Sequence, residues 1–384
     1  MIRQNFNADW TVEKGDGNSR MNSFLGNTQT KTVHLPYDAM IHEARTPDTK
    51  NGAQTGFYPG GEYIFQKHFT APQAWQGKPV SLVFEGVYQT ALVYLNGWLL
   101  TRNVNGYAEF TVEAGPYLKY GADNLLKVIA DNSLEPNSRW YTGSGIYRPV
   151  RLLVGNKVYL PQDTVRITTR EADEGFALLD VTAQVQSAST VTERVTLQQT
   201  ICREGTAVLT DRQNLLLQPG ESRTVSFRYC VDSPALWSPE NPNLYTSTMQ
   251  VLEGEEELDR EETGFGIRTL SIDAAHGVRI NGQTVKLRGA CIHHDNGILG
   301  AATLPDAEER RIRQLKEAGF NAIRSSHHPA GRALLDACDR YGVLVMDELS
   351  DVWNVRKNPY DYALYFEQDW KPTIQKMVAK DYNH

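Results

Sequence analysis

The C-terminal part of this chain alternates between strand-like and helix-like segments, and this pattern constrains the fold more than any other feature. Apolar residues at helical spacing predict one helix over Asp306–Ala318 and another around Leu334–Tyr341, and a glycine follows each of them. Three apolar strand segments precede, separate and follow these helices: Val285–Ala290, Phe320–Arg324 and Val343–Met346. The order strand, helix, strand, helix, strand predicts a parallel sheet.

This C-terminal pattern is typical of the first strands of a TIM (β/α)8 barrel. A further helix is predicted from about Tyr365 to Lys380, and residues 280 to 384 amount to about 105 of the roughly 250 that such a barrel uses. We therefore expect an incomplete barrel with an open third strand, and a homo-oligomer or a second chain that completes it. On the first helix, a charged set is expected to face solvent: Glu308, Glu309, Arg310 and Arg313.

The residues before the barrel segment are rich in strand signals with turns at short intervals, which is typical of β-sandwiches. Asn96-Gly97, between Ala91–Leu95 and Trp98–Leu100, predicts a two-residue hairpin in a first sandwich of the jelly-roll type. Alternating apolar residues in Leu178–Val185 and Val195–Ile201 predict a second, immunoglobulin-like sandwich. We expect a multi-domain protein, mainly β and then α/β, with domains at residues 1–158, 159–272 and 273–384.

Composition argues against several classes of partner. The 384 residues carry a net charge of -7 without a basic cluster, so neither nucleic acid nor a membrane surface is expected as a partner. The N-terminus lacks an apolar leader, and no run approaches the ~18 apolar residues of a membrane-spanning helix. A cytoplasmic protein is expected, although a mature secreted or periplasmic form would look the same. Four widely spaced cysteines are expected to be reduced: Cys202, Cys230, Cys291 and Cys338.

Sequence motifs occur in a consistent order along the whole chain. They are Arg139–Pro149, Trp237–Tyr245 and, in the barrel segment, Lys286–Gly289, His293–Asp295, Gly319–His327, Cys338–Gly342, Met346–Glu348 and Asp381–His384. Together they resemble glycoside hydrolase family 2, the family of β-galactosidases and β-glucuronidases, and Asp351–Trp353 with Asn358–Tyr362 is most similar to a β-galactosidase branch.

This resemblance implies the N-terminal portion of a retaining exo-β-glycosidase that hydrolyses terminal β-D-galactosides. The expected partner is therefore a β-galactoside or a related oligosaccharide. β-Glucuronidase and β-mannosidase are the alternatives within the family. A non-catalytic carbohydrate-binding or interaction protein is the alternative of another class.

Retaining glycosidases need two carboxyl groups roughly 5 to 5.5 Å apart, one as acid/base and one as nucleophile. The resemblance places both beyond the motif that matches Asp381–His384, so no catalytic residue is assigned here and the 384 residues alone are expected to be inactive. Asp347 and Glu348 end the third predicted strand, where their side chains point to opposite faces, so they are not the catalytic pair. One of them is expected to orient its neighbours, with a direct substrate contact as the alternative. Arg324, at the end of the second strand, is expected to pair with either carboxylate.

Other polar and aromatic residues follow the predicted strands, where barrel enzymes bind substrate. His293 and His327 match family histidines that contact the sugar, and the resemblance implies hydrogen bonds to its hydroxyls. Asp295 either accepts a hydrogen bond from a sugar hydroxyl or caps its loop. Asp351 and Trp353 follow the third strand, and the Trp353 ring either stacks on a pyranose face or packs in the core or an interface.

No metal site is predicted. The adjacent histidines His293 with His294, and those at 327–328, diverge, and no carboxylate stands at the spacing that would complete a site. The second histidine of each pair is expected to contribute less to sugar binding than the first. A sodium or divalent ion occurs in some family members, but its ligands are not matched, because Arg139 replaces an aspartate and residues 349–353 lack the carboxylate and histidine pair.

Overall fold

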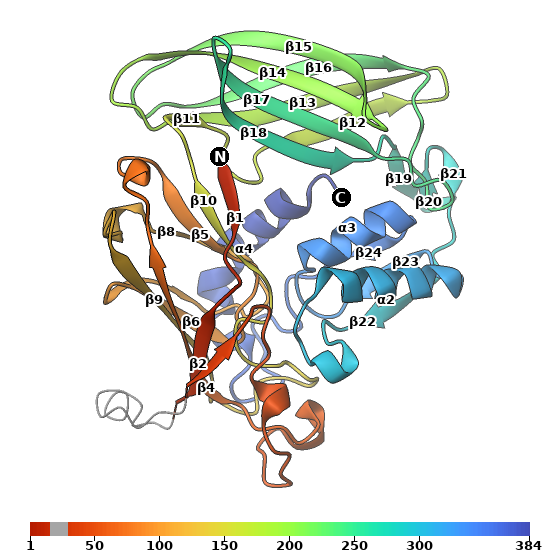
Figure 1. The fold of residues 1–384 in the computed structure, drawn as a ribbon. Coiled ribbons are helices and arrows are strands. Elements are labelled where there is room, and N and C mark those ends of the chain that lie inside the picture. Colours follow the sequence, from red (N-terminus) through yellow and green to blue (C-terminus); the bar gives the residue numbers. More distant parts are fainter. Residues whose placement is uncertain (16–29) are drawn as a thin grey trace.

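The computed structural model describes residues 1–15 and 30–384 (Figure 1). Its first part is a sandwich of two antiparallel sheets, one in the order β3-β2-β4-β9-β6-β7 and the other in the order β1-β10-β5-β8. The strands are β1 Ile2–Asn5, β2 Trp10–Lys14, β3 Lys31–Val33, β4 Gly61–Thr70, β5 Val80–Phe84, β6 Thr90–Leu95, β7 Trp98–Asn103, β8 Phe110–Glu113, β9 Asp123–Asn132 and β10 Val150–Val154. Large side chains such as Trp10, Phe65 and Phe84 fill the space between the sheets.

The predicted hairpin in this sandwich is confirmed. Leu95 of β6 pairs with Trp98 of β7, and the two turn residues both have positive φ, 52° for Asn96 and 90° for Gly97. Asparagine and glycine adopt this left-handed conformation most readily, which is why two residues suffice to reverse the chain.

The second part of the chain is another sandwich, drawn across the top of Figure 1. One sheet has the order β15-β14-β17-β18, and the other places β13 between β16 and the pair β11 and β12. The strands are β11 Val158–Tyr159, β12 Arg166–Ala172, β13 Phe176–Ser187, β14 Glu193–Arg203, β15 Thr206–Leu217, β16 Ser222–Asp232, β17 Tyr245–Glu253 and β18 Glu256–Phe265. In β13 every second residue from Ala177 to Val185 is buried, so the predicted alternation is confirmed.

The barrel segment opens with a small antiparallel sheet, β19-β20-β21, and continues with a parallel sheet, β22-β23-β24. The elements are β19 Leu270–Asp273, β20 Gly277–Ile280, β21 Gln283–Thr284, β22 Gly289–Ile292, α2 Pro305–Glu317, β23 Ala322–Ser325, α3 Arg332–Tyr341, β24 Leu344–Met346 and α4 Phe366–Asp381. The predicted parallel order and helices are confirmed.

The position predicted for the first parallel strand, Val285–Ala290, is wrong. Val285 donates its amide to the Val278 carbonyl oxygen at 2.9 Å and so extends the small antiparallel sheet. The Asn321 side chain then binds the Lys286 carbonyl at 3.0 Å and the Arg288 amide at 2.7 Å, in place of a strand partner. The strand begins only at Gly289, because these main-chain groups are already satisfied.

Helices α2 and α3 cover one face of the parallel sheet. Ile312, Leu335 and Cys338 from the helices form a buried cluster with Ile323 of β23. Glu308 was expected on the solvated face of α2 but is 2% exposed, because it accepts a hydrogen bond from Asn296 Nδ2 at 2.8 Å in the loop after β22.

The other face of the parallel sheet is open within the described residues. The strand register aligns Cys291, Arg324 and Met346 in one row across this face, and Met346 is 60% exposed. Polar and apolar side chains of this row are therefore accessible next to the strand ends.

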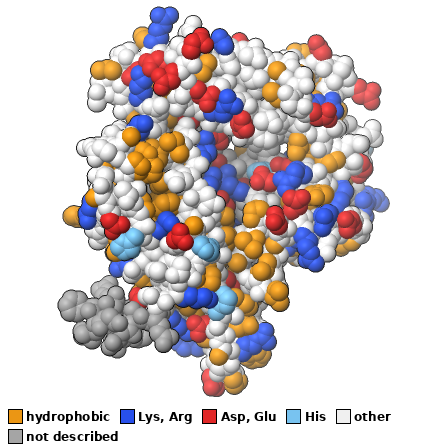
Figure 2. Space-filling model, in the orientation of Figure 1, with side chains coloured by type: hydrophobic (Ala, Val, Ile, Leu, Met, Phe, Trp, Pro, Cys, Tyr) orange, Lys and Arg blue, Asp and Glu red, His pale blue; other side chains and the backbone are white. Residues whose placement is uncertain are grey.

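On the face shown in Figure 2, basic and acidic side chains are interspersed, and the surface is hollowed where the second sandwich meets the other two parts. Within the described ranges, no helix combines the length and apolar character needed to cross a membrane.

Candidate active site

The ends of the parallel strands meet a loop of the first sandwich, residues 137–142. His293 follows β22 and stacks on Trp140 of this loop, with ring centroids 5.1 Å apart and planes at 17°. His327 follows β23 and meets the same indole edge-on at 5.5 Å, while the two imidazole rings lie 6.0 Å apart. The structure therefore brings the two histidines predicted to bind sugar together, against an aromatic surface from another domain.

Glu348, which follows β24, binds the side chains of Arg324 and His327. Its Oε1 accepts from Arg324 Nε at 2.5 Å, and its Oε2 lies 2.9 Å from His327 Nδ1. Of the two carboxylates predicted to pair with Arg324, Glu348 is therefore the one that does, and it also orients the His327 ring. The other ring nitrogen, Nε2, lies 3.9 Å from Asp351 Oδ1.

Asp347 points the other way, as predicted for neighbouring residues at a strand end. Its Oδ1 accepts from the Ala330 amide at 2.9 Å. Burial, and then the neighbouring Asp381 carboxylate, raise the pKa of Asp347 to about 7. Asp347 and Glu348 therefore do not face one pocket.

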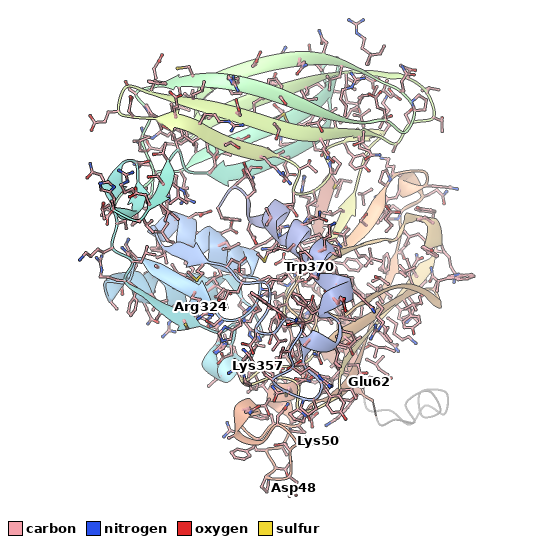
Figure 3. All side chains as sticks on the ribbon, turned by 180° about the vertical axis from the view of Figure 1, so that it is seen from behind. Asp48, Lys50, Glu62, Arg324, Lys357 and Trp370 are labelled. Carbon is pink, nitrogen blue, oxygen red and sulfur yellow. The ribbon has the colours of Figure 1, made fainter. Side chains whose placement is uncertain are left out.

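Asp351 is engaged by two cations rather than left free for substrate. Arg139 donates to it through Nε at 3.2 Å and Nη2 at 2.7 Å, and Lys357 Nζ donates at 2.8 Å. Burial acts to raise the pKa of Asp351, but the hydrogen bonds from Lys357 and Arg139 hold that pKa below its usual range. Figure 3 shows Lys357 below the sheet that carries Arg324.

Two further predicted residues lie differently from expectation. The Trp353 side chain is 68% exposed and is not among the residues that line the cavity beside His327, so packing in the core is wrong. Within residues 30–384 the Asp295 carboxylate caps no backbone amide, and only its main-chain oxygen is bound, by Arg311 Nη2. Both side chains remain candidates for substrate contact.

The cavity beside His327 has a volume of about 50 Å³ and is walled by both the first sandwich and the barrel segment. Tyr88, Tyr107 and Trp140 supply aromatic walls, and Asn137 and Asp351 supply polar ones. Sequence reasoning missed these sandwich residues, although Trp140 lies inside a motif, Arg139–Pro149, that is typical of the family.

His294 and His328 lie buried behind the site. His294 Nε2 contacts the Thr142 carbonyl oxygen at 2.9 Å, and the His328 ring stacks on Tyr107 at 4.2 Å. Burial lowers the pKa of His294 to about 3 and that of His328 well below its usual range, so both rings are neutral at pH 7. Neither lies with His293 and His327 against Trp140.

Among the described residues, no group of His, Cys, Asp or Glu side chains at this site has the spacing to hold a metal ion. Elsewhere in the described residues, a group that could hold an ion is Asp336, Asp339 and His384, whose ligand atoms lie within 4.8 Å of one another. Asp336 and Asp339 lie on α3 and His384 lies three residues after α4, away from the strand ends that carry His293 and His327.

Three family models match the chain in succession. "Glycosyl hydrolase 2 galactose-binding domain-like" matches residues 10–176, "Glycosyl hydrolases family 2" matches 158–268, and "Glycosyl hydrolases family 2, TIM barrel domain" matches 274–384. The chain is 37% identical over 383 residues to Beta-galactosidase BoGH2A of Bacteroides ovatus, and 26% identical over 381 residues to a Beta-glucuronidase of Bacteroides fragilis. These alignments span 100% and 92% of this chain, but 45% and 52% of the relatives.

Solved structures agree with this assignment. A glycosyl hydrolase family 2 member from Bacteroides cellulosilyticus superposes with a TM-score of 0.95 at 36% identity, covering 100% of this chain and 50% of that one. A beta-glycosidase from Bacteroides vulgatus gives 0.92 at 31% identity, covering 100% and 49%. The chain therefore spans about half the length of the relatives it matches. With three successive domain matches, the chain belongs to the glycosyl hydrolases family 2.

Proposed function

We propose that this chain forms the N-terminal, sugar-binding part of a retaining exo-β-glycosidase that acts on terminal β-D-galactosides. The observation that carries the proposal is the convergence of His293, His327 and Trp140 at the ends of parallel strands. Burial lowers the pKa of His293, so its neutral ring can exchange hydrogen bonds with sugar hydroxyls at pH 7. The identity to a protein named as a beta-galactosidase favours galactosides, and relatives named as beta-glucuronidases make β-glucuronides the second candidate.

The carboxylates near His327 are already engaged by protein groups. Glu348 binds Arg324 and His327, and Asp351 binds Arg139. Asp347 turns away to Ala330. We propose that the acid/base and the nucleophile come from the part of the relatives' length that this chain does not span.

The test is hydrolysis of aryl β-D-galactoside, β-D-glucuronide and β-D-mannoside by the full-length enzyme that contains these residues. Preferred turnover of the galactoside, with retention of configuration shown by NMR of the first product, is the expected result. The 384-residue polypeptide alone is expected to be inactive. If the full-length protein binds oligosaccharides without hydrolysing any of the three, the enzyme proposal is overturned in favour of a carbohydrate-binding protein.

A further inference from the structure

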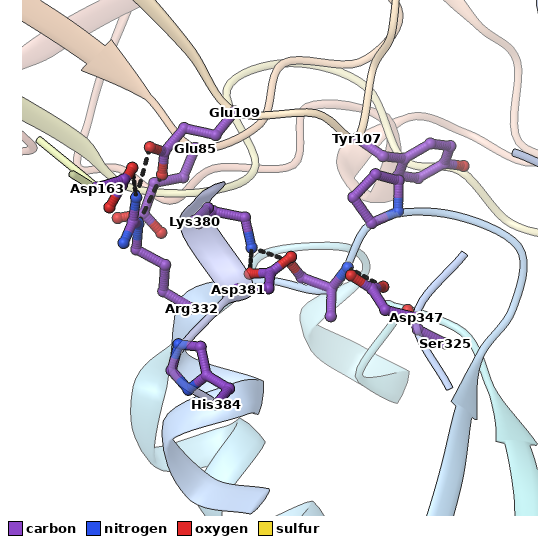
Figure 4. Close-up of polar contacts among 12 residues, drawn as sticks. Glu85, Tyr107, Glu109, Asp163, Ser325, Arg332, Asp347, Lys380, Asp381 and His384 are labelled. Atoms are coloured by element: carbon purple, nitrogen blue, oxygen red, sulfur yellow. Dashed lines mark hydrogen bonds and ion pairs between the residues drawn. The ribbon is translucent and has the colours of Figure 1, made fainter. Parts of the chain in front are cut away.

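The loop between β23 and α3, residues 326–331, carries His327 and is held through its main chain by three different parts of the protein. Arg148, from the first sandwich, donates through Nη2 to the Pro329 carbonyl at 3.0 Å. Lys380, from α4, donates to the Ala330 carbonyl at 3.0 Å, and Asp347, after β24, accepts from the Ala330 amide at 2.9 Å. Figure 4 shows Lys380 and Asp347 reaching the same stretch of backbone.

Arg148 is a buried cation whose hydrogen bonds go to main-chain oxygens instead of carboxylates. It is 3% exposed, and no carboxylate of the described residues lies within ion-pair distance of it. Its other donor, Nη1, binds the Tyr107 carbonyl at 2.7 Å, and its guanidinium lies 5.3 Å from the Tyr147 ring centroid. A buried cation normally needs a charged partner. Here its hydrogen bonds go to main-chain oxygens beside the site.

Consecutive carboxylates hold the two ends of this loop. Glu348 Oε2 lies 2.9 Å from His327 Nδ1, and Asp347 binds the amide of Ala330, three residues further on. Between them, Ser325 Oγ donates to the His328 carbonyl at 2.8 Å. The opposite directions of Asp347 and Glu348 thus give the loop fixed points on both sides of His328.

We propose that Arg148, Asp347 and Lys380 are positioning residues that set the place of the His327 ring by fixing the peptide units of residues 329 and 330. This inference rests on the proposed function, in which His327 binds the sugar. It gives the first sandwich a part in the reaction beyond lining the cavity, since Arg148 reaches from that sandwich into the barrel segment.

The test is a double-mutant cycle in the full-length enzyme. Asp347→Ala is expected to lower kcat/KM by about 10- to 100-fold, the cost of small misplacements of a binding group. In a His327→Ala background the same change is expected to alter kcat/KM by less than about twofold, because Asp347 then has nothing left to position. Asp347→Asn keeps an oxygen acceptor for the Ala330 amide and should retain most of the activity.

The matched control is Trp237→Phe, which removes a hydrogen bond of the same kind between the second sandwich and the barrel segment. Trp237 Nε1 donates to the Asp339 carbonyl at 3.0 Å, outside the loop. This variant should lower the melting temperature but leave kcat/KM within about twofold of the wild type. If the effects of Asp347→Ala and His327→Ala simply multiply, the positioning role is overturned.

A second measurement does not depend on activity. Arg148→Met should speed hydrogen–deuterium exchange in peptides that cover residues 326–331, whereas Trp237→Phe should not. Arg148 binds only carbonyl oxygens in this loop, so faster exchange would report motion of the loop rather than loss of an amide partner. Unchanged exchange would overturn the inference. A wild-type enzyme that hydrolyses no β-glycoside would overturn the proposed function alone, and the exchange result would still decide the positioning role.

Discussion

Arg139 and Asp351 are 212 residues apart in the sequence, yet they form a two-point ion pair between the first sandwich and the loop after β24. The Asp351 side chain is 10% exposed and that of Arg139 is 43% exposed. The pair holds the sandwich loop that carries Trp140 against the loop beside His327. Its main effect is therefore on the geometry of the site.

Arg139→Ala in the full-length enzyme should lower kcat/KM for an aryl β-galactoside by about tenfold, which corresponds to about 1.4 kcal/mol. A partly exposed ion pair adds little stability, so the free energy of unfolding should fall by no more than about 1 kcal/mol. Arg170→Ala is the control, since Arg170 pairs with Asp180 on the second sandwich at 2.6 Å. Equal activity losses in both variants would show that the Arg139 pair does not support the site.

His293→Ala and His327→Ala should each lower kcat/KM by about 10² or more, the range seen when one donor to a transition state is removed. Steady-state kinetics of the full-length enzyme measures this. His276→Ala is the comparison, because His276 lies in the turn between β19 and β20 with a side chain that is 57% exposed. Small and similar effects at all three positions would assign His293 and His327 a purely structural role.

The raised pKa of Asp347 makes stability depend on pH. A folded-state pKa of about 7 lies above the unfolded value of roughly 3.9. The contribution of the Asp347 carboxyl group to the free energy of unfolding is therefore fully present below about pH 4 and lost as the pH rises through 7. The Asp347→Asn side chain cannot ionise. As the pH rises from about 4 to 7, the free energy of unfolding of this variant should therefore increase relative to that of the wild type, by up to about 1.4 kcal/mol for each pH unit. Melting temperatures of both proteins at pH 4.5 and pH 8 test this, and parallel pH curves would contradict it.

His294 should have the opposite pH dependence. Its pKa of about 3 lies below the unfolded value of roughly 6.5, so its stabilising contribution is present above pH 6.5 and lost as the pH falls toward 3. Between pH 6.5 and 4.5 the wild type should lose roughly 2 to 3 kcal/mol through this group. His294→Gln, whose amide can still donate to Thr142, should show a shallower slope in urea unfolding at the two pH values. An identical slope would rule out titration of His294 as the cause.

Local patterns predicted the elements whose stability is local. The spacing of Leu334, Leu335 and Cys338 predicted α3, and the Asn96-Gly97 turn predicted its hairpin. The first barrel strand was misplaced because Asn321, more than thirty residues away along the chain, binds the main chain at Lys286 and Arg288. No local pattern carries that information.

The candidate site divides in the same way. The sequence by itself determined which residue types follow each strand, and hence that His293, His327 and Glu348 lie at one edge of a parallel sheet, because strand direction and spacing decide this. Only the tertiary structure decided what they touch. Trp140, rather than the exposed Trp353, packs on the histidines, and Asp351 is held by Arg139. Ion pairing and ring stacking act over a few ångströms, so they depend on how whole domains pack, which the spacing of residues along one segment does not encode.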